Sequence, residues 1–297
     1  MKRRVALLIL TFYLQSYVAN SQTGLLKNKI EQITKTKQAK VGVAILGLDG
    51  KDTLTFNGNG HFPMQSVYKF HLALAVLNQV DKGNMSLNQK IFINKTDLRT
   101  DTWSPLREKY PNGNVNIALS ELISFTVSQS DNNGCDILFK FIGGPKKVND
   151  YIHSLGVKDV AIMSNEEVMQ ADWNVQYTNF STPVAAVQLL EKFHKKHILS
   201  KTSQYFLWKT MVETTTGSTK IKALLPKTAI LAHKTGWSGT NKDGLTGATN
   251  DIGIVTLPNG KQFIIAIFVT NSMEKEATND RMIAEIAKAT WDYFISQ

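Results

Sequence analysis

Residues 62–80 read FPMQSVYKFHLALAVLNQV, and the interpretation of the whole chain starts from this stretch. From Val67 to Val80 the apolar residues fall on nearly every side of a helix. A helix that is hydrophobic all round is buried. Yet Lys69 stands one turn after Ser66, near the start of the run. Because burying an ammonium group costs several kcal/mol unless it is paired or neutralised, this lysine needs a specific reason to be there.

Chemistry between the two side chains supplies such a reason. Residues three apart share a helix face, so the Lys69 amine can reach the Ser66 hydroxyl. Backbone N–H groups at a helix start can also stabilise a developing anion. The pattern predicts a nucleophile with its activator. Ser-x-x-Lys alone is weak support, since a second copy at 272–275 is expected in an exposed loop. The alternative is a helix-capping serine with a lysine that extends to solvent.

The N-terminus has the features of a secretory signal peptide. Residues 1–21 combine a basic start, a short apolar core from Val5 to Leu14, and small residues before Gln22. The core is too short to span a membrane comfortably, although an uncleaved anchor is the alternative. We therefore expect a periplasmic or secreted protein without a stable membrane anchor.

Composition excludes several classes of function. The formal net charge of +10 falls to about +7 without residues 1–21, and the basic clusters are short and lack interleaved aromatic residues. Nucleic-acid binding is therefore not expected. The single cysteine, Cys135, cannot form an internal disulfide, so stability must come from the hydrophobic core. The scattered histidines indicate no metal site; we expect no cofactor, and nothing indicates a state other than a monomer.

Hydrophobic periodicity predicts the order of the elements. Two hairpin strands are expected at 41–57, helices between 62 and 213, two-residue periodicity after Pro226, and a final helix over 280–295. This order predicts an antiparallel sheet assembled from both ends of the chain, with an inserted helical domain. The expected boundaries are 22–60 and 212–297 for the sheet domain and 61–211 for the helical domain. A cleft between the domains is the natural site.

Two further motifs change the weight of the first. Gln129 to Asn133 reads QSDNN in a break between helices, and His233 to Gly236 reads HKTG on a strand pattern. Alone, these would be a helix cap with a turn and an edge strand with a solvated lysine. Ser-x-x-Lys, Ser-Asp-Asn and Lys-Thr-Gly in this order are, however, the motif set of class A β-lactamases and penicillin-binding proteins.

The chain resembles the class A serine β-lactamases over essentially its whole mature length, and within them the PER-type extended-spectrum branch. The resemblance is carried by MQSVYKF (64–70), TWSP (102–105), VETTTG (212–217), AHKTG (232–236) and ATNDIGI (248–254). It implies a mixed α/β fold of the β-lactamase/transpeptidase type, with a five-stranded antiparallel sheet flanked by helices. It also implies a small-molecule β-lactam substrate, opened through an acyl-enzyme.

The resemblance implies a role for each motif residue. Ser66 would attack the lactam carbonyl, with Lys69 assisting proton removal directly or through a water, and Ser130 would pass a proton to the lactam nitrogen. Backbone N–H groups of Ser66 and Trp237 would stabilise the oxyanion. Lys234, Thr235 and Gly236 would bind the substrate carboxylate, with Lys220 as an extra cation. Asn132 would bind the acylamide side chain, and Trp103 would line the mouth of the cleft.

Hydrolysis of the acyl-enzyme requires a carboxylate that activates water. By resemblance Glu166 is this base and Gln170 helps to hold the water. The adjacent Glu167 is the alternative, but on an extended loop its side chain would lie on the opposite side from Glu166 and point away from the site. The family usually has an Arg–Asp pair where this chain has Ser164 and Asn179, and usually Asn where it has Gln170. The loop is then expected to rely on hydrogen bonds, with a wider cleft suited to oxyimino-cephalosporins. The bulky Trp237, where small residues usually follow Lys-Thr-Gly, leaves the substrate profile open.

Other readings share part of this pattern. A penicillin-binding DD-peptidase has the three motifs but no efficient deacylating glutamate, and a β-lactam sensor becomes acylated without turnover. Serine-dependent glutaminases also use Ser-x-x-Lys, but export would be unusual for them. A purely structural module would leave the buried Lys69 unexplained. Turnover and covalent trapping distinguish these readings.

Overall fold

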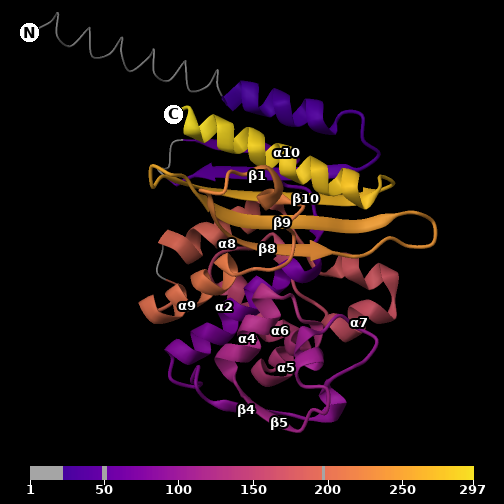
Figure 1. Ribbon diagram of the computed structural model, residues 1–297, viewed down its shortest axis with the longest axis vertical. Helices are drawn as coiled ribbons and strands as arrows, with labels where there is room; N and C mark the ends of the chain where they lie inside the picture. The colour runs from indigo at the N-terminus through magenta and orange to yellow at the C-terminus, as the bar shows by residue number, and fades with distance from the viewer. Residues whose placement is uncertain (1–22, 49–51, 196–197) are drawn as a thin grey trace, which may run out of the picture.

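The computed structural model describes residues 23–48, 52–195 and 198–297. The expected signal peptide lies outside these residues. The central element is a five-stranded antiparallel sheet with strand order β2-β1-β10-β9-β8 (Figure 1). Its strands are β1 (Lys40–Gly47), β2 (Thr53–Phe56), β8 (Ile230–Trp237), β9 (Thr246–Thr256) and β10 (Gln262–Ser272). The predicted fold class is thereby confirmed.

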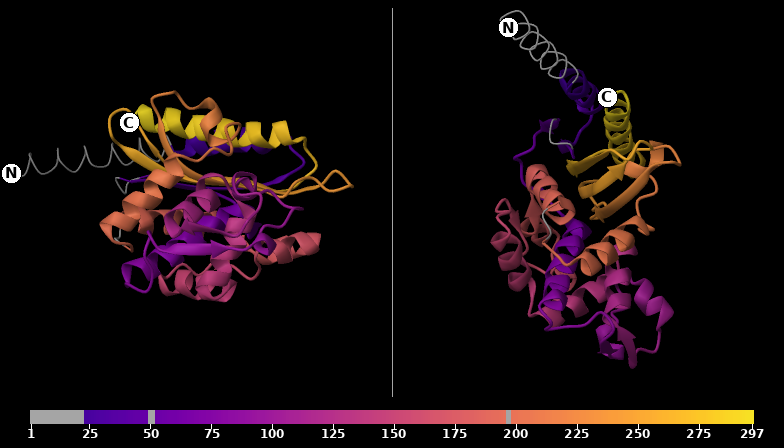
Figure 2. Two further views of the ribbon diagram at one scale, coloured as in Figure 1. Left: turned by 60° about the horizontal axis from the view of Figure 1, so that its bottom comes forward. Right: turned by 90° about the vertical axis from the view of Figure 1, so that its left-hand side faces the viewer.

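The sheet joins the two ends of the chain. In the β1–β10 ladder Lys40 lies opposite Thr270, and Gly47 lies opposite Phe263. Nearly every residue of β9 and β10 is buried, because helices cover both faces of the sheet. Helix α10 (Glu276–Ile295) and a helix over 23–34 lie on one face, and the other helices lie on the opposite side (Figure 2). Such two-sided burial favours continuous apolar strands rather than alternating ones.

The middle of the chain is mostly helical. Two small sheets, of order β3-β7-β6 and β4-β5, lie among these helices. Their strands are β3 (Phe62–Pro63), β4 (Lys90–Ile93), β5 (Val115–Ala118), β6 (Val160–Ala161) and β7 (Phe180–Ser181). The helices are α2 (Tyr68–Asp81), α3 (Pro105–Lys109), α4 (Leu119–Ser128), α5 (Asn132–Ile142), α6 (Pro145–Ser154), α7 (Glu166–Ala171), α8 (Pro183–Lys195) and α9 (Lys201–Val212). Short 3₁₀ turns are η1 (Gln65–Val67), η2 (Lys95–Asp97), η3 (Trp173–Thr178) and η4 (Ile221–Leu224).

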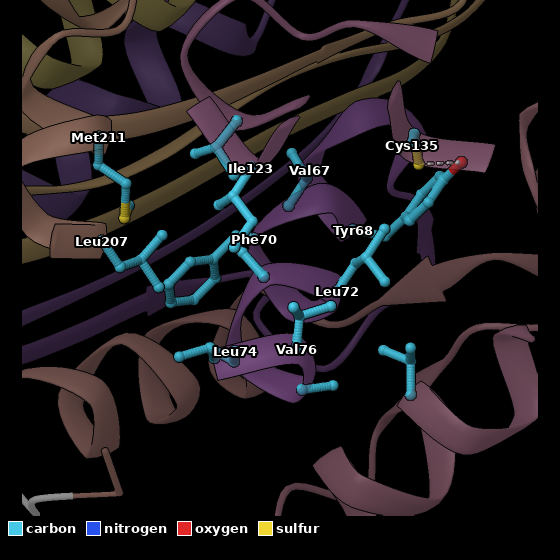
Figure 3. Close-up of a cluster of buried hydrophobic side chains, with 14 of the residues drawn as sticks. Val67, Tyr68, Phe70, Leu72, Leu74, Val76, Ile123, Cys135, Leu207 and Met211 are labelled. Carbon is cyan, nitrogen blue, oxygen red and sulfur yellow. Dashed lines mark hydrogen bonds between the residues drawn. The ribbon is translucent and has the colours of Figure 1, made fainter. Parts of the chain in front are cut away.

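Helix α2 runs through the centre of the helical region. Its residues from Tyr68 to Leu77 are all buried, as the all-round apolar pattern predicted. Phe70 and Leu74 lie beside Leu207 of α9, while Tyr68 on another side of the helix meets Cys135 of α5 (Figure 3). Cys135 is a buried free thiol. The helix that carries the Ser-x-x-Lys motif is therefore held from several directions, which keeps the motif rigid.

One hydrophobic cluster joins this helix to the sheet. It includes Leu72 and Leu122 from the helical region together with Ile254 and Phe268 from the sheet. A second cluster, under α10 and the 23–34 helix, covers the other face of the sheet. Because a single core crosses the expected boundaries near 61 and 212, the division into two domains stays a prediction.

Three details differ from the sequence-based expectation. The 23–34 helix was not predicted; Leu26 and Ile30 bury its inner face. Helix α10 begins at Glu276 rather than at 280. The second Ser-x-x-Lys copy is not exposed at its serine, because Ser272 is buried and donates to Asn279 Oδ1 at 2.7 Å. Among the described residues, no helix has the length and apolar character needed to cross a bilayer.

Candidate active site

Ser66 lies in the 3₁₀ turn η1, and α2 follows directly. One turn later the Lys69 side chain is completely buried, and its Nζ donates to Ser66 Oγ at 3.0 Å. The alternative of a lysine that extends to solvent is therefore wrong. The hydroxyl and the amine form the contact that the motif predicted, on a helix that cannot rotate without disturbing the core.

The buried ammonium of Lys69 has more oxygen neighbours than protons. Besides Ser66, it donates to the backbone oxygen of Ser130 at 2.8 Å and to Asn132 Oδ1 at 2.5 Å. Glu166 Oε1 is a fourth oxygen, 2.9 Å from Nζ. An ammonium has three protons, so this last contact is an ion pair without its own hydrogen bond. Lys69 thus connects the serine turn, the Ser-Asp-Asn break and the Glu166 helix.

A second buried lysine stands on the other side of Ser130. Lys234 Nζ donates to Ser130 Oγ at 3.0 Å and to the Thr235 backbone oxygen at 2.9 Å. Burial disfavours its charged form and the nearby Lys69 repels it, which together lower the pKa of Lys234 to about 7. Ser130 itself has a left-handed backbone, with φ of 59°. The hydroxyl of Ser130 is therefore in contact with an amine able to exchange a proton near neutral pH.

Strand β8 forms an edge of the sheet, and this edge faces η1. Ser238 N donates to Ala248 O of β9 at 3.0 Å. Because successive N–H groups along a strand point to opposite edges, the N–H of Trp237 points away from β9 toward η1. Gly236 permits the close approach, since a Cβ there would lie 2.4 Å from Met64 O. Trp237 and Ser66 line the same cavities beside this contact, so their backbone N–H groups are candidates for an oxyanion hole.

Glu166 is the first residue of α7, and an aspartate holds this helix start. Asp136 of α5 accepts from Glu166 N at 2.8 Å and from Glu167 N at 3.0 Å. Burial and the nearby Glu166 carboxylate raise the pKa of Asp136 to about 7. Glu166 is buried and turned toward Lys69, whereas Glu167 is exposed. The geometry favours Glu166 over Glu167, but the segment is helical where an extended loop was expected.

Hydrogen bonds hold the loop in place of an Arg–Asp pair, as expected. The Asn179 side chain accepts from Met163 N at 2.7 Å and Ser164 N at 2.9 Å, and it donates to Ser164 O at 2.8 Å. Gln170 at the end of α7 donates to Thr102 Oγ1 and accepts from Arg99. One asparagine amide therefore closes the loop without a charge.

The surface above Ser66 is hollowed into two adjoining cavities. The first, about 350 Å³, is lined by Ser66, Ser130, Thr235 and Gly236, with Trp103 at its rim. The second, about 370 Å³, lies on the side of Glu166 and Gln170. Ser66, Asn132 and Trp237 line both cavities, and the indole of Trp237 is half exposed. The sequence-predicted residues are thus brought together around one cleft.

Two substrate-binding expectations need revision or refinement. Lys220 lines the first cavity, but its ammonium is paired with Asp280 and donates to Thr249 Oγ1 at 2.8 Å. It is a neutralised pair rather than a free extra cation. Asn132 uses its side-chain oxygen for Lys69 and its nitrogen for Thr102 Oγ1 at 2.8 Å. An acylamide group must therefore share or displace these partners.

Sequence reasoning missed the supporting residues Asp136 and Asp280. It also missed the pair in which Gln65 Nε2 donates to Gln176 Oε1 at 2.8 Å. Each acts through a partner that is distant in sequence, so no local pattern pointed to it. Among the residues that the structure describes, no group of three or more His, Cys, Asp or Glu side chains is placed to hold a metal ion.

Comparison with known proteins identifies a family and several relatives that this chain resembles. The family model described as "Beta-lactamase enzyme family" matches residues 25–294. Beta-lactamase VEB-1 of Pseudomonas aeruginosa is 47% identical, over 99% of each chain. Extended-spectrum beta-lactamase PER-1 of the same species is 44% identical, over 97% of this chain and 92% of its own. The crystal structure of TLA-3 extended-spectrum beta-lactamase superposes with a TM-score of 0.91, at 57% identity, covering 92% of this chain and 99% of its own.

Proposed function

Because this chain belongs to the β-lactamase enzyme family, as a class A β-lactamase that hydrolyses the β-lactam ring, we propose the residues that carry out each step. The observation that carries the proposal is the buried Lys69, which contacts both Ser66 Oγ and Glu166 Oε1. A serine beside an amine is able to form an ester. A carboxylate held on the other side of the same amine can direct water to that ester.

Acylation begins with attack of Ser66 Oγ on the lactam carbonyl. Lys69 and Glu166 form the buried acid–base pair that takes up the hydroxyl proton, directly or through a water. The N–H groups of Ser66 and Trp237 stabilise the oxyanion. Ser130 delivers a proton to the lactam nitrogen as the ring opens. The contact of Ser130 with Lys234 supports this role, because it supplies a nearby proton donor whose pKa is about 7.

Deacylation requires water to be activated beside the ester. Glu166 is the general base for this water, with Gln170 at the edge of the same cavity. Proton transfer from the water to the carboxylate produces the nucleophile that releases the product and frees Ser66. An efficient deacylating carboxylate distinguishes a hydrolase from a peptidase or a sensor, and nothing among the relatives favours the DD-peptidase alternative.

We further propose that the substrates include oxyimino-cephalosporins. The substrate carboxylate would lie against Thr235 and Gly236 in the first cavity, with the buried Lys234 beneath them as the nearby positive charge. The second cavity, between Trp237 and the loop that Asn179 closes, would receive the bulky acylamide substituent. The relatives PER-1 and TLA-3 are named extended-spectrum enzymes, which supports this assignment.

We also propose that the enzyme acts as a periplasmic or secreted monomer.

The deciding experiment follows hydrolysis of a chromogenic cephalosporin by the purified enzyme, with intact-mass measurement of each reaction. We expect rapid turnover by the parent and a trapped covalent adduct on Ser66 in Glu166→Ala. Glu167→Ala is the matched control, since its exposed carboxylate lies one residue away, and it should turn over as the parent does. Accumulation of the adduct by the parent without turnover would show that the hydrolytic assignment is wrong.

A further inference from the structure

The residue directly before the nucleophile has an unusual backbone. Gln65 has φ of 48°, in the left-handed region that non-glycine residues seldom adopt. Such a conformation persists only where surrounding contacts hold it. Its own side chain makes one such contact, since Gln65 Nε2 donates to Gln176 Oε1 at 2.8 Å. The turn that presents Ser66 is therefore fastened by an amide–amide hydrogen bond.

The partner is itself firmly fixed. Gln176 is almost completely buried in η3, and its Nε2 donates to the Trp173 backbone oxygen at 2.8 Å. That oxygen can only accept, so Nε2 of Gln176 must face it and Oε1 must face Gln65. A Cβ at Gly247 would lie 2.4 Å from Gln176 Oε1, so β9 leaves this amide no room to move toward it. The Gln176 amide therefore has a single orientation, in which it accepts from Gln65.

The contact joins the turn that carries Ser66 to the segment that follows the Glu166 helix. Gln176 belongs to η3, which packs against α7, the helix that begins at Glu166. Gln65 and Gln176 line the same cavity as Ser66 and Glu166. Lys69 is another bridge between these halves, through Ser66 Oγ and Glu166 Oε1. Once Ser66 is an ester, its oxygen is a poorer acceptor, and the Lys69 bridge weakens at the step that needs precise alignment.

We propose that the Gln65–Gln176 hydrogen bond is a positioning contact that fixes the Ser66 ester relative to Glu166 and thereby sets the rate of deacylation. The inference rests on the proposed function, in which Glu166 directs water to that ester. Neither glutamine touches the reacting atoms. Their effect is on geometry, because water can be shared productively between a carboxylate and an ester only at a fixed separation.

A double-mutant cycle tests the proposal. Gln65→Met, Gln176→Met and the double variant remove the hydrogen bond while keeping similar side-chain volume. Single-turnover kinetics with a chromogenic cephalosporin give the acylation and deacylation rate constants separately. We expect each single variant to deacylate about tenfold more slowly, the loss typical of one hydrogen bond, and the double variant to be no slower than either. Acylation should stay within about twofold of the parent.

Controls separate positioning from general loosening of the fold. Gln204→Met removes a glutamine of α9 that donates to the backbone oxygens of Phe193 and His194, away from the cleft. It should leave both rate constants unchanged. Gln65→Glu keeps the shape but cannot donate to Gln176, so it should also deacylate slowly and serves if a methionine variant does not fold. The amount of covalent adduct formed per mole of protein measures the fraction of correctly folded enzyme in every case.

Three results would overturn the proposal: equal slowing of both steps, multiplicative losses in the double variant, or parental deacylation in Gln65→Glu. A parent that forms the adduct without releasing it would instead refute the hydrolytic function, because that result does not depend on the glutamine variants. The two failures are therefore distinguishable.

Discussion

His71 of α2 should make the enzyme sensitive to acid. Its side chain is completely buried, and neither ring nitrogen has a hydrogen-bond partner of normal geometry among the described atoms. Burial lowers the pKa of His71 from 6.5 to about 4, and the nearby Val67 carbonyl opposes this only in part. The unfolded chain therefore binds the histidine proton more tightly than the folded enzyme does. Stability from this group is complete above pH 6.5 and is lost as the pH falls toward 4.

The size of the loss follows from the two pKa values. The difference between the two pKa values corresponds to about 3 kcal/mol when the pH is well below 4. Between pH 8 and pH 5 the same linkage gives a loss of about 2 kcal/mol. This is a large fraction of the stability of an ordinary domain, which is about 5–15 kcal/mol.

The measurement compares the parent with His71→Leu by urea unfolding at pH 8, 7, 6 and 5. Other titrating groups act equally in both proteins, so the difference in unfolding free energy isolates the histidine. We expect the parent to lose about 2 kcal/mol relative to His71→Leu between pH 8 and 5. A difference that stays constant over this range would refute the reasoning, since it would mean that the folded enzyme accommodates the imidazolium.

Three further predictions concern the site. The Lys234 pKa of about 7 predicts that kcat/KM falls as the pH rises through this value, because the free enzyme loses a cation that attracts the substrate carboxylate. Lys234→Arg should give a flat pH profile, and a flat parental profile up to pH 9 would contradict the assignment. Asp136→Asn leaves one of the two N–H donors at the start of α7 without an acceptor, so deacylation should slow about tenfold, and the parental deacylation rate should decline below pH 7 as Asp136 becomes protonated. Gly236→Ala should lower kcat about 100-fold, because the added methyl group collides with Met64 O and separates the oxyanion donors. Gly24→Ala, where a Cβ meets no atom within 4 Å, should have no effect, and a parental kcat in Gly236→Ala would show that the close contact is not required.

The sequence allowed accurate prediction where the chemistry is local or repeated in pattern. The Ser66–Lys69 contact followed from helical spacing, and the antiparallel sheet followed from the strand patterns at both ends of the chain, although β9 and β10 are buried on both faces rather than alternating. The place of Gly236 at a close approach could not be read from a strand pattern, because it depends on Met64, which is distant in sequence.

The same limit applies to charges. Lys220 was expected to be available to the substrate, but Asp280, 60 residues later, neutralises it. Asp136 looked like an ordinary residue of α5, and only folding places it under the start of α7. Individual contacts that join distant elements carry no periodic signal. Family resemblance could name the reacting residues, but it did not reveal what holds them.

The strand order of the main sheet has a consequence for how the chain is made. Strand β10 lies between β1 and β9, so the strand synthesised first has no inner neighbour until almost the whole chain has left the ribosome. Pairing between segments so far apart forms late and slowly. A chain that stops before Gln262 would lack this central strand, leaving β1 and β9 with unpaired edges. We therefore expect premature termination even near the C-terminus to yield aggregation rather than a partly active enzyme.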